Sequence, residues 1–149
     1  MVNFSLPTKI NGILHYNRQL CDNDIIDILC DFDMNDLLSF IRFSPEKYCR
    51  NIIHKNEHYE LLLLCWRGGQ ESIIHSHGNS ICGLKVMHGT ATETLYEAKD
   101  ANYVSLHEKV ISIGEHCIRH GDDIHKISNR QKNGKDLITL HLYSPPLGG

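Results

Sequence analysis

The feature that most constrains the fold of this chain is a series of short strand-like segments that begins at about residue 50. Each segment is apolar or alternates apolar with polar residues, and turn residues separate one segment from the next. We predict strands within 51–53, 59–66, 84–96, 103–113, 115–119 and 137–143, with the segment 84–96 divided at His88-Gly89. Asn133-Gly134 predicts a hairpin that joins Lys126-Ile127 to the last strand. Many short strands, with no repeat of solenoid length, indicate an all-β barrel or sandwich.

Short helices are predicted ahead of these strands. Apolar residues within 22–32 recur at helical spacing after Asp22, a suitable N-cap, and a second helix fits 35–41. Ser44-Pro45 has the form of a cap followed by proline at the first helical position. We therefore expect one domain over 1–149, with a helical N-terminal part at about 20–48 and a β-barrel at about 50–146.

Composition excludes several classes of protein. A net charge of −3 with 22% charged residues shows no bias toward nucleic acid or membrane surfaces. The longest apolar run, 61–66, is far too short to cross a bilayer, and 1–16 lacks the layout of a signal peptide. The six cysteines include no Cys-x-x-Cys pair, so reduced thiols in a cytoplasmic protein are expected.

A His-x-His dipeptide, His75-Ser76-His77, lies in the glycine-bracketed segment between Gly69 and Gly89. In a strand, side chains two residues apart project from the same face, so both imidazoles could bind one divalent metal ion. A helical metal pair would instead be separated by four residues, so this spacing itself favours β-structure. A third ligand must come from elsewhere, and His125 is the candidate because it follows the turn Gly121-Asp122-Asp123.

Both segments resemble the two motifs of the cupin superfamily. The first has glycine, His-x-His and a closing glycine in the expected order, while the second matches at Gly114, His125 and Asn129. Two departures occur in the second segment: His120 stands where the motif has proline, and the inner glycine is displaced to Gly121. The resemblance implies a cupin jelly roll with short N-terminal helices and a metal held by His75, His77 and His125.

Two further features narrow the resemblance to the cysteine dioxygenase family. Cys82 stands where most cupins have a glutamate ligand, and the chain carries the ending His141-Leu142-Tyr143-Ser144-Pro145-Pro146. The similarity extends from about Tyr48 to Pro146. It implies an Fe(II) enzyme that oxidises L-cysteine with O2 to cysteine sulfinic acid, with the substrate thiolate supplying the negative charge that the ligand set lacks.

Arg50 is the candidate for binding the carboxylate of the substrate. A guanidinium binds a carboxylate through two parallel hydrogen bonds, and an α-amino acid thiol brings such a carboxylate. The segment Tyr48-Cys49-Arg50-Asn51 resembles the family's carboxylate-binding segment, which implies that Arg50 and Tyr48 bind substrate. Related mercaptopropionate dioxygenases carry glutamine at the arginine position, so Arg50 favours cysteine.

Thr139, His141 and Tyr143 alternate with aliphatic residues near the end of the chain, which places all three on one face of a strand. A polar row inside a barrel forms a hydrogen-bond relay, here one that would orient His141 and through it the Tyr143 phenol. The family has serine, histidine and tyrosine at these places, so Thr139 keeps the hydroxyl. The resemblance also implies that Cys82 and Tyr143 are a pair able to form a thioether crosslink; a free buried cysteine is the alternative.

Three other functions remain open at this point. The first is a dioxygenase of another small thiol such as 3-mercaptopropionate, and the second is a non-catalytic cupin that binds a metal or thiol. A zinc cupin with hydrolytic or isomerase activity is the third, because three histidines also suit zinc. In each case we expect a monomer that binds a small molecule, and neither nucleic acid nor membrane.

Overall fold

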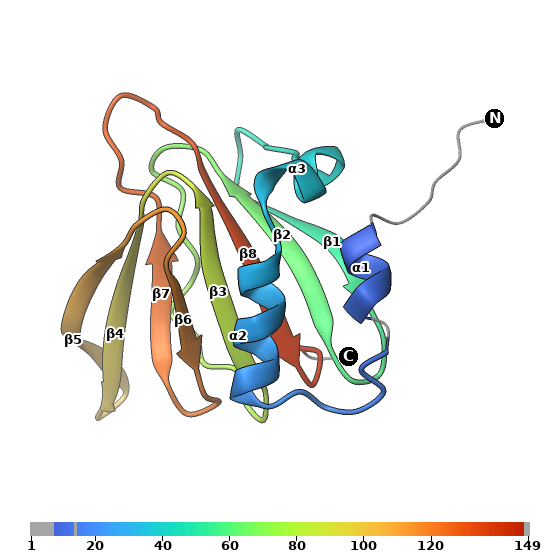
Figure 1. Cartoon of the computed structure of the whole chain (residues 1–149). Coiled ribbons are helices and arrows are strands. Elements are labelled where there is room, and N and C mark those ends of the chain that lie inside the picture. The colour runs from blue at the N-terminus through green and yellow to red at the C-terminus, as the bar shows by residue number, and fades with distance from the viewer. Residues whose placement is uncertain (1–7, 14, 148–149) are drawn as a thin grey trace.

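Two antiparallel sheets form the body of the protein (Figure 1). The computed structural model describes residues 8–13 and 15–147. The five-stranded sheet has the order β1-β2-β8-β3-β6, and the three-stranded sheet has the order β5-β4-β7. The strands are β1 (Cys49–Lys55), β2 (Glu60–Trp66), β3 (Ile81–His88), β4 (Ala91–Lys99), β5 (Asn102–Ile111), β6 (His116–Arg119), β7 (Ile124–Ser128) and β8 (Leu137–Ser144). This is the all-β architecture that the sequence predicts, with the boundary between β3 and β4 at Gly89-Thr90.

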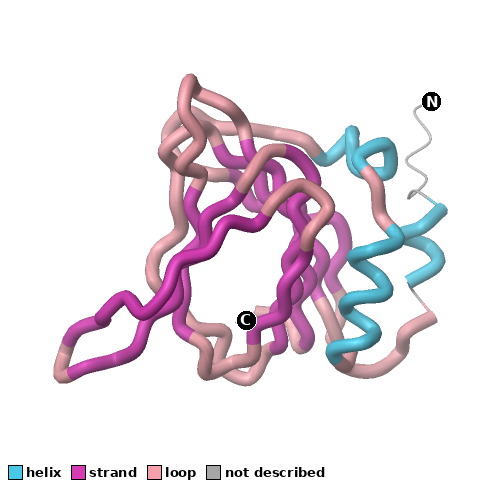
Figure 2. The backbone as a smooth tube through the Cα atoms, turned by 60° about the vertical axis from the view of Figure 1, so that its left-hand side comes forward, coloured by secondary structure: helices cyan, strands magenta, loops and turns pink. Residues whose placement is uncertain are grey.

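The helices precede all the strands and lie on one side of them (Figure 2). They are α1 (Thr8–Ile13), α2 (Asp22–Asp31), α3 (Met34–Leu37) and the short 3-10 helix η1 (Leu38–Phe40). Among the described residues, none of these helices is long and apolar enough to cross a membrane.

The neighbouring strands β2 and β8 of the five-stranded sheet are buried on both faces, which explains the unbroken apolar run of β2. Odd-numbered residues of β2 belong to a core beneath the helices, and even-numbered residues to a second core between the two sheets. Leu61 and Leu63 pack in the first core, whereas Leu62 and Leu64 pack in the second. Because neither face of β2 meets solvent, its sequence need not alternate apolar with polar residues.

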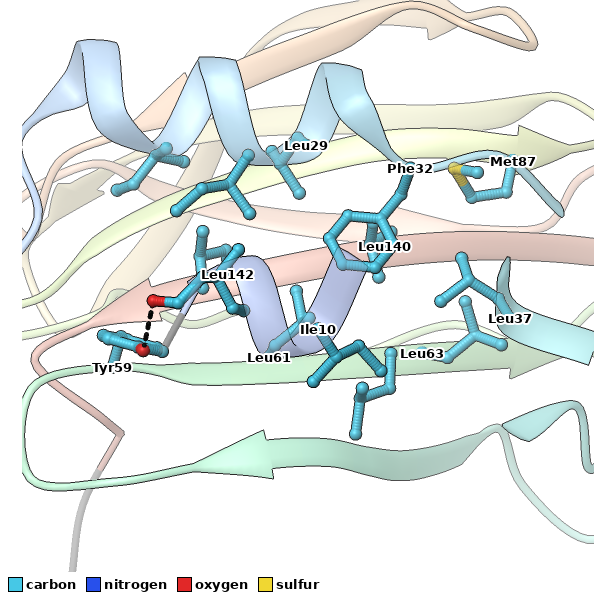
Figure 3. Packing of buried hydrophobic residues seen from close by; sticks show 14 of the residues in the cluster. Ile10, Leu29, Phe32, Leu37, Tyr59, Leu61, Leu63, Met87, Leu140 and Leu142 are labelled. Carbon is cyan, nitrogen blue, oxygen red and sulfur yellow. Dashed lines mark hydrogen bonds between the residues drawn. The ribbon is translucent and has the colours of Figure 1, made fainter. Parts of the chain in front are cut away.

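The helix-side core is assembled by aliphatic side chains of β2 and β8 against α1 and α2 (Figure 3). Leu29 on α2 and Leu140 on β8 are fully buried there. Close packing of α2 on β3 requires Gly83, because a Cβ at that position would lie 2.2 Å from Ile25 Cγ2. Tyr59 donates a hydrogen bond of 2.9 Å to the carbonyl of Ile13, which fixes the end of α1 to the sheet.

Four details differ from the sequence predictions, the first at the N-terminal end. The first predicted helix exists, but Cys21 is its N-cap and Asp22 is its first residue. The backbone amide of Cys21 donates to the Asp24 carboxylate, so a carboxylate one turn further on caps this end. Residues 8–13, for which no element was predicted, form α1.

No helix follows Ser44-Pro45, so the helical part ends at Phe40 and not near residue 48. The hydroxyl of Ser44 does accept a hydrogen bond from the Glu46 amide, at 3.3 Å. The chain then bends toward β1 instead of continuing helically. A local cap signal without a following apolar periodicity therefore produced only a turn.

The predicted hairpin at Asn133-Gly134 is wrong. Both residues have positive φ, as the dipeptide favours, but the strands on either side belong to different sheets. β7 pairs with β4, whereas β8 pairs with β2 and β3. The turn thus lies in a connection that crosses from one sheet to the other.

The His75-Ser76-His77 segment is extended but is not a regular strand. It contacts the chain near β7 through isolated bridges, Glu71 with Ser128 and His75 with His125. Between these bridges the pairing is interrupted, and a turn at Gly78-Asn79 follows directly. Reciprocal hydrogen bonds of 2.9 Å between the backbones of His75 and His125 fix the two segments to each other.

Candidate metal centre

His75, His77 and His125 meet in the space between the two sheets. One ring nitrogen of each lies within 4.8 Å of one ring nitrogen of the others. Their ring centroids are separated by 4.7 to 4.9 Å, with the rings tilted or edge-on to one another. Three imidazoles converging in this way are a ligand set for one metal ion with open coordination positions.

Hydrogen bonds determine which nitrogen each imidazole can offer. His75 Nδ1 lies 2.7 Å from the carbonyl oxygen of Ile73, and His125 Nδ1 lies 2.8 Å from Glu93 Oε2. A carbonyl and a carboxylate only accept, so each Nδ1 carries the proton and donates it. The lone pair on Nε2 of His75 and of His125 is consequently left for a metal.

Buried nitrogen atoms without partners fit a bound cation. Within the part of the chain that the structure describes, neither His77 Nδ1 nor His125 Nε2 has a hydrogen-bond partner, although both are buried. Burial, with neighbouring His125 and His75, lowers the pKa of His77 to about 3. The imidazole is therefore neutral at physiological pH, the form that binds metals.

A cavity between the sheets holds the predicted site residues. Those that line it are Tyr48, Arg50, His75, His77, Cys82, His125, His141 and Tyr143. Thr139 is fully buried and lies one layer behind, against His141. The remaining predicted alternatives lie elsewhere: His120 is exposed and 3.0 Å from Asp22, and the His116 ring faces Cys30.

Arg50, on β1, lines one side of the cavity. Its guanidinium carbon lies 5.8 Å from the centroid of the Tyr143 ring, so the charged group reaches the cavity although the residue as a whole is exposed. Burial opposes its charge, but Tyr143 and Tyr48 outweigh this and raise the pKa of Arg50. Tyr48 is stacked on Trp66 with 4.1 Å between ring centroids, which holds it beside the cavity. The arrangement offers a fixed cation to a small anion.

The polar row of β8 forms a relay that begins at Trp66 on β2, a residue that the sequence did not assign to it. Trp66 Nε1 donates to Thr139 Oγ1 at 3.0 Å, and Thr139 Oγ1 lies 2.7 Å from His141 Nε2. His141 Nδ1 then lies 3.2 Å from the Tyr143 hydroxyl. Burial, with the positive charge of Arg50 nearby, holds the pKa of His141 well below its usual range, so the ring carries one proton.

One arrangement of protons satisfies every contact of the relay. Trp66 can only donate, so the Thr139 oxygen accepts from it, and the Thr139 hydroxyl has its own proton available for His141 Nε2. The single ring proton of His141 is then on Nδ1 and is donated to the Tyr143 oxygen. In this arrangement the Tyr143 proton is left free to point into the cavity.

Cys82 and Tyr143 lie directly opposite each other on β3 and β8. Side chains at opposed positions of an antiparallel pair have Cβ atoms only about 4.5–5.5 Å apart. Burial is the main cause that raises the pKa of both the thiol and the phenol, so both groups are neutral. The register thus brings together the thiol and the phenol that were predicted as a crosslink pair.

Gly121 explains the displaced glycine of the second motif. A Cβ at this position would lie 1.6 Å from the carbonyl oxygen of Gly78, so only glycine allows the two turns to touch. The Gly121 carbonyl accepts a hydrogen bond of 3.2 Å from the His77 amide. This contact positions the backbone that carries His77.

Sequence reasoning missed two residues next to the site, Glu93 and Trp66. Glu93 is fully buried on β4 and accepts from His125, yet in sequence it sits between two threonines and resembles a solvated strand residue. Trp66 was noted only as part of an apolar run, although its indole N–H starts the relay. The one available signal for the burial of Glu93 was a charged residue within a strand in which polar and apolar residues alternate.

Comparison with known proteins identifies the family. The family model for "Cysteine dioxygenase type I" matches residues 6–149. Cysteine dioxygenase type 1 of Homo sapiens is 33% identical over 154 aligned residues, covering 94% of this chain and 76% of the human protein. The Danio rerio protein of the same name is 32% identical over 155 residues, with the same coverage of 94% and 76%.

Solved structures support the fold. A protein from Thermus thermophilus has a TM-score of 0.64 at 18% identity, covering 77% of this chain and 99% of its own. An RmlC-like cupin from Desulfovibrio desulfuricans has a TM-score of 0.54 at 18% identity, covering 75% and 95%. The predicted fold class, a cupin jelly roll with short N-terminal helices, is therefore confirmed.

Proposed function

The chain belongs to the cysteine dioxygenase type I family, and we propose on that basis that it is a ferrous-iron thiol dioxygenase acting on L-cysteine. The product would be cysteine sulfinic acid, with both oxygen atoms of O2 transferred to sulfur. The observation that carries the proposal is a set of three histidines with no carboxylate among the candidate ligands, placed in one cavity with a guanidinium.

The proposed metal site consists of His75, His77 and His125. Neutral ligands leave a divalent ion with its full charge, which favours an anionic sulfur over a neutral ligand. Ferrous iron, when bound, supplies the redox chemistry that joins dioxygen to the thiol. The protein supplies ligands in a fixed arrangement and a buried surrounding that limits access of water.

Arg50 and Tyr48 bind the substrate in this proposal. An ionised carboxylate placed in a partly buried cavity needs a charged partner, and Arg50 is the cationic side chain that lines it among the described residues. The histidines come from β7 and the segment before β3, whereas Arg50 comes from β1 on the opposite sheet. A small molecule with a thiol at one end and a carboxylate at the other would match both groups.

The relay and the crosslink pair complete the proposed site. Thr139 and His141 hold the phenol of Tyr143 in one orientation, with its proton directed into the cavity. Cys82 occupies the position of a carboxylate ligand and, being a neutral thiol, keeps the ligand set uncharged. We propose that Cys82 and Tyr143 form a thioether during turnover, with dioxygen as the oxidant that removes the two hydrogen atoms.

We further propose one domain that takes part in cysteine metabolism as a cytoplasmic monomer. A reducing compartment keeps free cysteine in the thiol form that the site would use. The proposed partners are the thiol and O2 alone, with neither nucleic acid nor membrane.

Oxygen uptake tests the proposal directly. The protein is loaded with Fe(II) without oxygen and mixed with aerated L-cysteine, 3-mercaptopropionate or cysteamine, and the products are identified with isotopically labelled dioxygen. We expect L-cysteine to give the fastest uptake and a sulfinate with two labelled oxygen atoms. Faster turnover of 3-mercaptopropionate would change the substrate, and iron retention without uptake on any thiol would indicate a non-catalytic cupin.

A further inference from the structure

A fully buried carboxylate lies directly behind the candidate metal site and has no role in the function proposed above. Glu93 on β4 has no solvent-exposed surface. Its Oε2 lies 2.8 Å from His125 Nδ1, on the side of the ring opposite to the nitrogen that faces the cavity. β4 and β7 are paired so that Leu95 opposes His125 and Glu93 opposes Ile127, which puts the carboxylate diagonally next to the imidazole.

Arg119 keeps this buried carboxylate charged. Its Nε and Nη2 donate to the two oxygens of Glu93 at 2.9 and 2.6 Å, the two-pronged geometry that suits a guanidinium and a carboxylate. Lys109 Nζ lies farther away, at 4.0 Å. Because the guanidinium of Arg119 is always charged, this contact holds Glu93 as a carboxylate. An ionised carboxylate can only accept from His125.

We propose that Glu93, held by Arg119, is a positioning residue that fixes the tautomer and ring orientation of His125 for metal binding. Because Glu93 accepts the Nδ1 proton, the lone pair of His125 is on Nε2, in the cavity. The proposal rests on the assignment of His125 as a metal ligand in the proposed function, and it adds a residue that the assignment does not contain.

The position of Glu93 also affects the charge at the candidate metal site. Cys82 removes a carboxylate from the ligand position, and Glu93 provides one that acts through an imidazole instead. A carboxylate at this distance makes the imidazole a stronger donor without occupying a coordination position. Since Arg119 balances its charge, the metal would keep the net positive charge that an incoming thiolate needs.

Nuclear magnetic resonance of the metal-free full chain tests the tautomer. Long-range correlations between ring protons and nitrogens distinguish a ring protonated on Nδ1 from one protonated on Nε2. We expect His125 of the parent protein to be protonated on Nδ1, and Glu93→Gln to shift the population toward Nε2. A parent His125 protonated on Nε2 would overturn the proposal without any variant, so the test survives if Glu93→Gln does not fold.

Cobalt(II) binding to the same full chain, followed by its visible absorption, separates positioning from general stability. Arg119→Gln is the matched control, because it breaks the ion pair between β6 and β4 but keeps the Glu93 carboxylate beside His125. We expect Glu93→Gln to weaken cobalt binding about 10–100-fold and Arg119→Gln to weaken it less. Equal losses in the two variants, or none in Glu93→Gln, would overturn the proposal. A parent chain that binds no cobalt would instead refute the metal centre of the proposed function.

Discussion

Replacing Thr139 by Val tests the directed relay from Trp66 to Tyr143. Valine has nearly the shape of threonine and suits a strand, so the change removes the hydroxyl and little else. The Trp66 indole N–H then loses its acceptor, and His141 Nε2 loses its hydrogen-bond partner. Trp66 is 1% exposed and His141 is 4% exposed, so neither orphaned group gains direct access to solvent.

The size of the effect follows from these two orphaned groups. Leaving a buried donor or acceptor without a partner costs about 1–3 kcal/mol, so the free energy of unfolding should fall by roughly 2–6 kcal/mol. Thr139→Ser is the matched control, because it keeps the hydroxyl and loses one buried methyl group. By area its cost is about 0.8 kcal/mol, plus a cavity contribution if the core does not close.

Urea unfolding of both variants measures this difference, and oxygen uptake with cysteine measures its effect on the Tyr143 phenol. We expect Thr139→Val to be less stable than Thr139→Ser and to turn over more slowly after correction for iron content. If the two variants were equally stable and equally active, the hydroxyl would carry no hydrogen bond of consequence. The relay through Thr139 would then be refuted.

Three further predictions address the site itself. His125→Ala should lose stoichiometric iron by elemental analysis and stay folded, whereas His116→Ala should keep it; retained iron in the first would reassign the ligand. Arg50→Ala should raise the KM for cysteine at least about 10-fold, on the order of a lost charged hydrogen bond, and barely change turnover of cysteamine, which lacks a carboxylate. Equal losses with both thiols would give Arg50 a structural role. After many turnovers, mass spectrometry should find the peptides of Cys82 and Tyr143 joined in a form that reductant does not separate, and Cys82→Gly should remain partly active; peptides that always separate would remove the crosslink from the model.

Local periodicity was enough to predict most of the strands. The alternation of Thr139, His141 and Tyr143 with aliphatic residues correctly placed the three polar groups on one face, since side-chain direction in a strand depends only on local geometry. The same alternation could not say that both faces are buried. That depends on α1 and α2 covering one face of the sheet, which is a tertiary contact.

The predictions that were wrong or missing also involve tertiary contacts that local sequence does not determine. Asn133-Gly134 adopts the turn that its residues favour, but pairing of β7 with β4 and of β8 with β3 decides that it joins two sheets. Glu93 was missed because a charged strand residue between two threonines gives only a weak signal of burial. Its partner Arg119 comes from the other sheet, and a contact between sheets leaves no periodic trace in either strand.

β8 is buried on both faces, and its even-numbered and odd-numbered residues have separate roles. Ile138, Leu140 and Leu142 contribute to the helix-side core, whereas His141 and Tyr143 line the cavity and Thr139 lies behind them. Residues on one face can therefore be substituted during evolution without changing the other face, as long as the backbone keeps its register. An insertion or deletion of a single residue would exchange the two faces, placing the relay under the helices and leucines against the candidate metal site. We expect β8 to tolerate variation in residue type far better than any change in length.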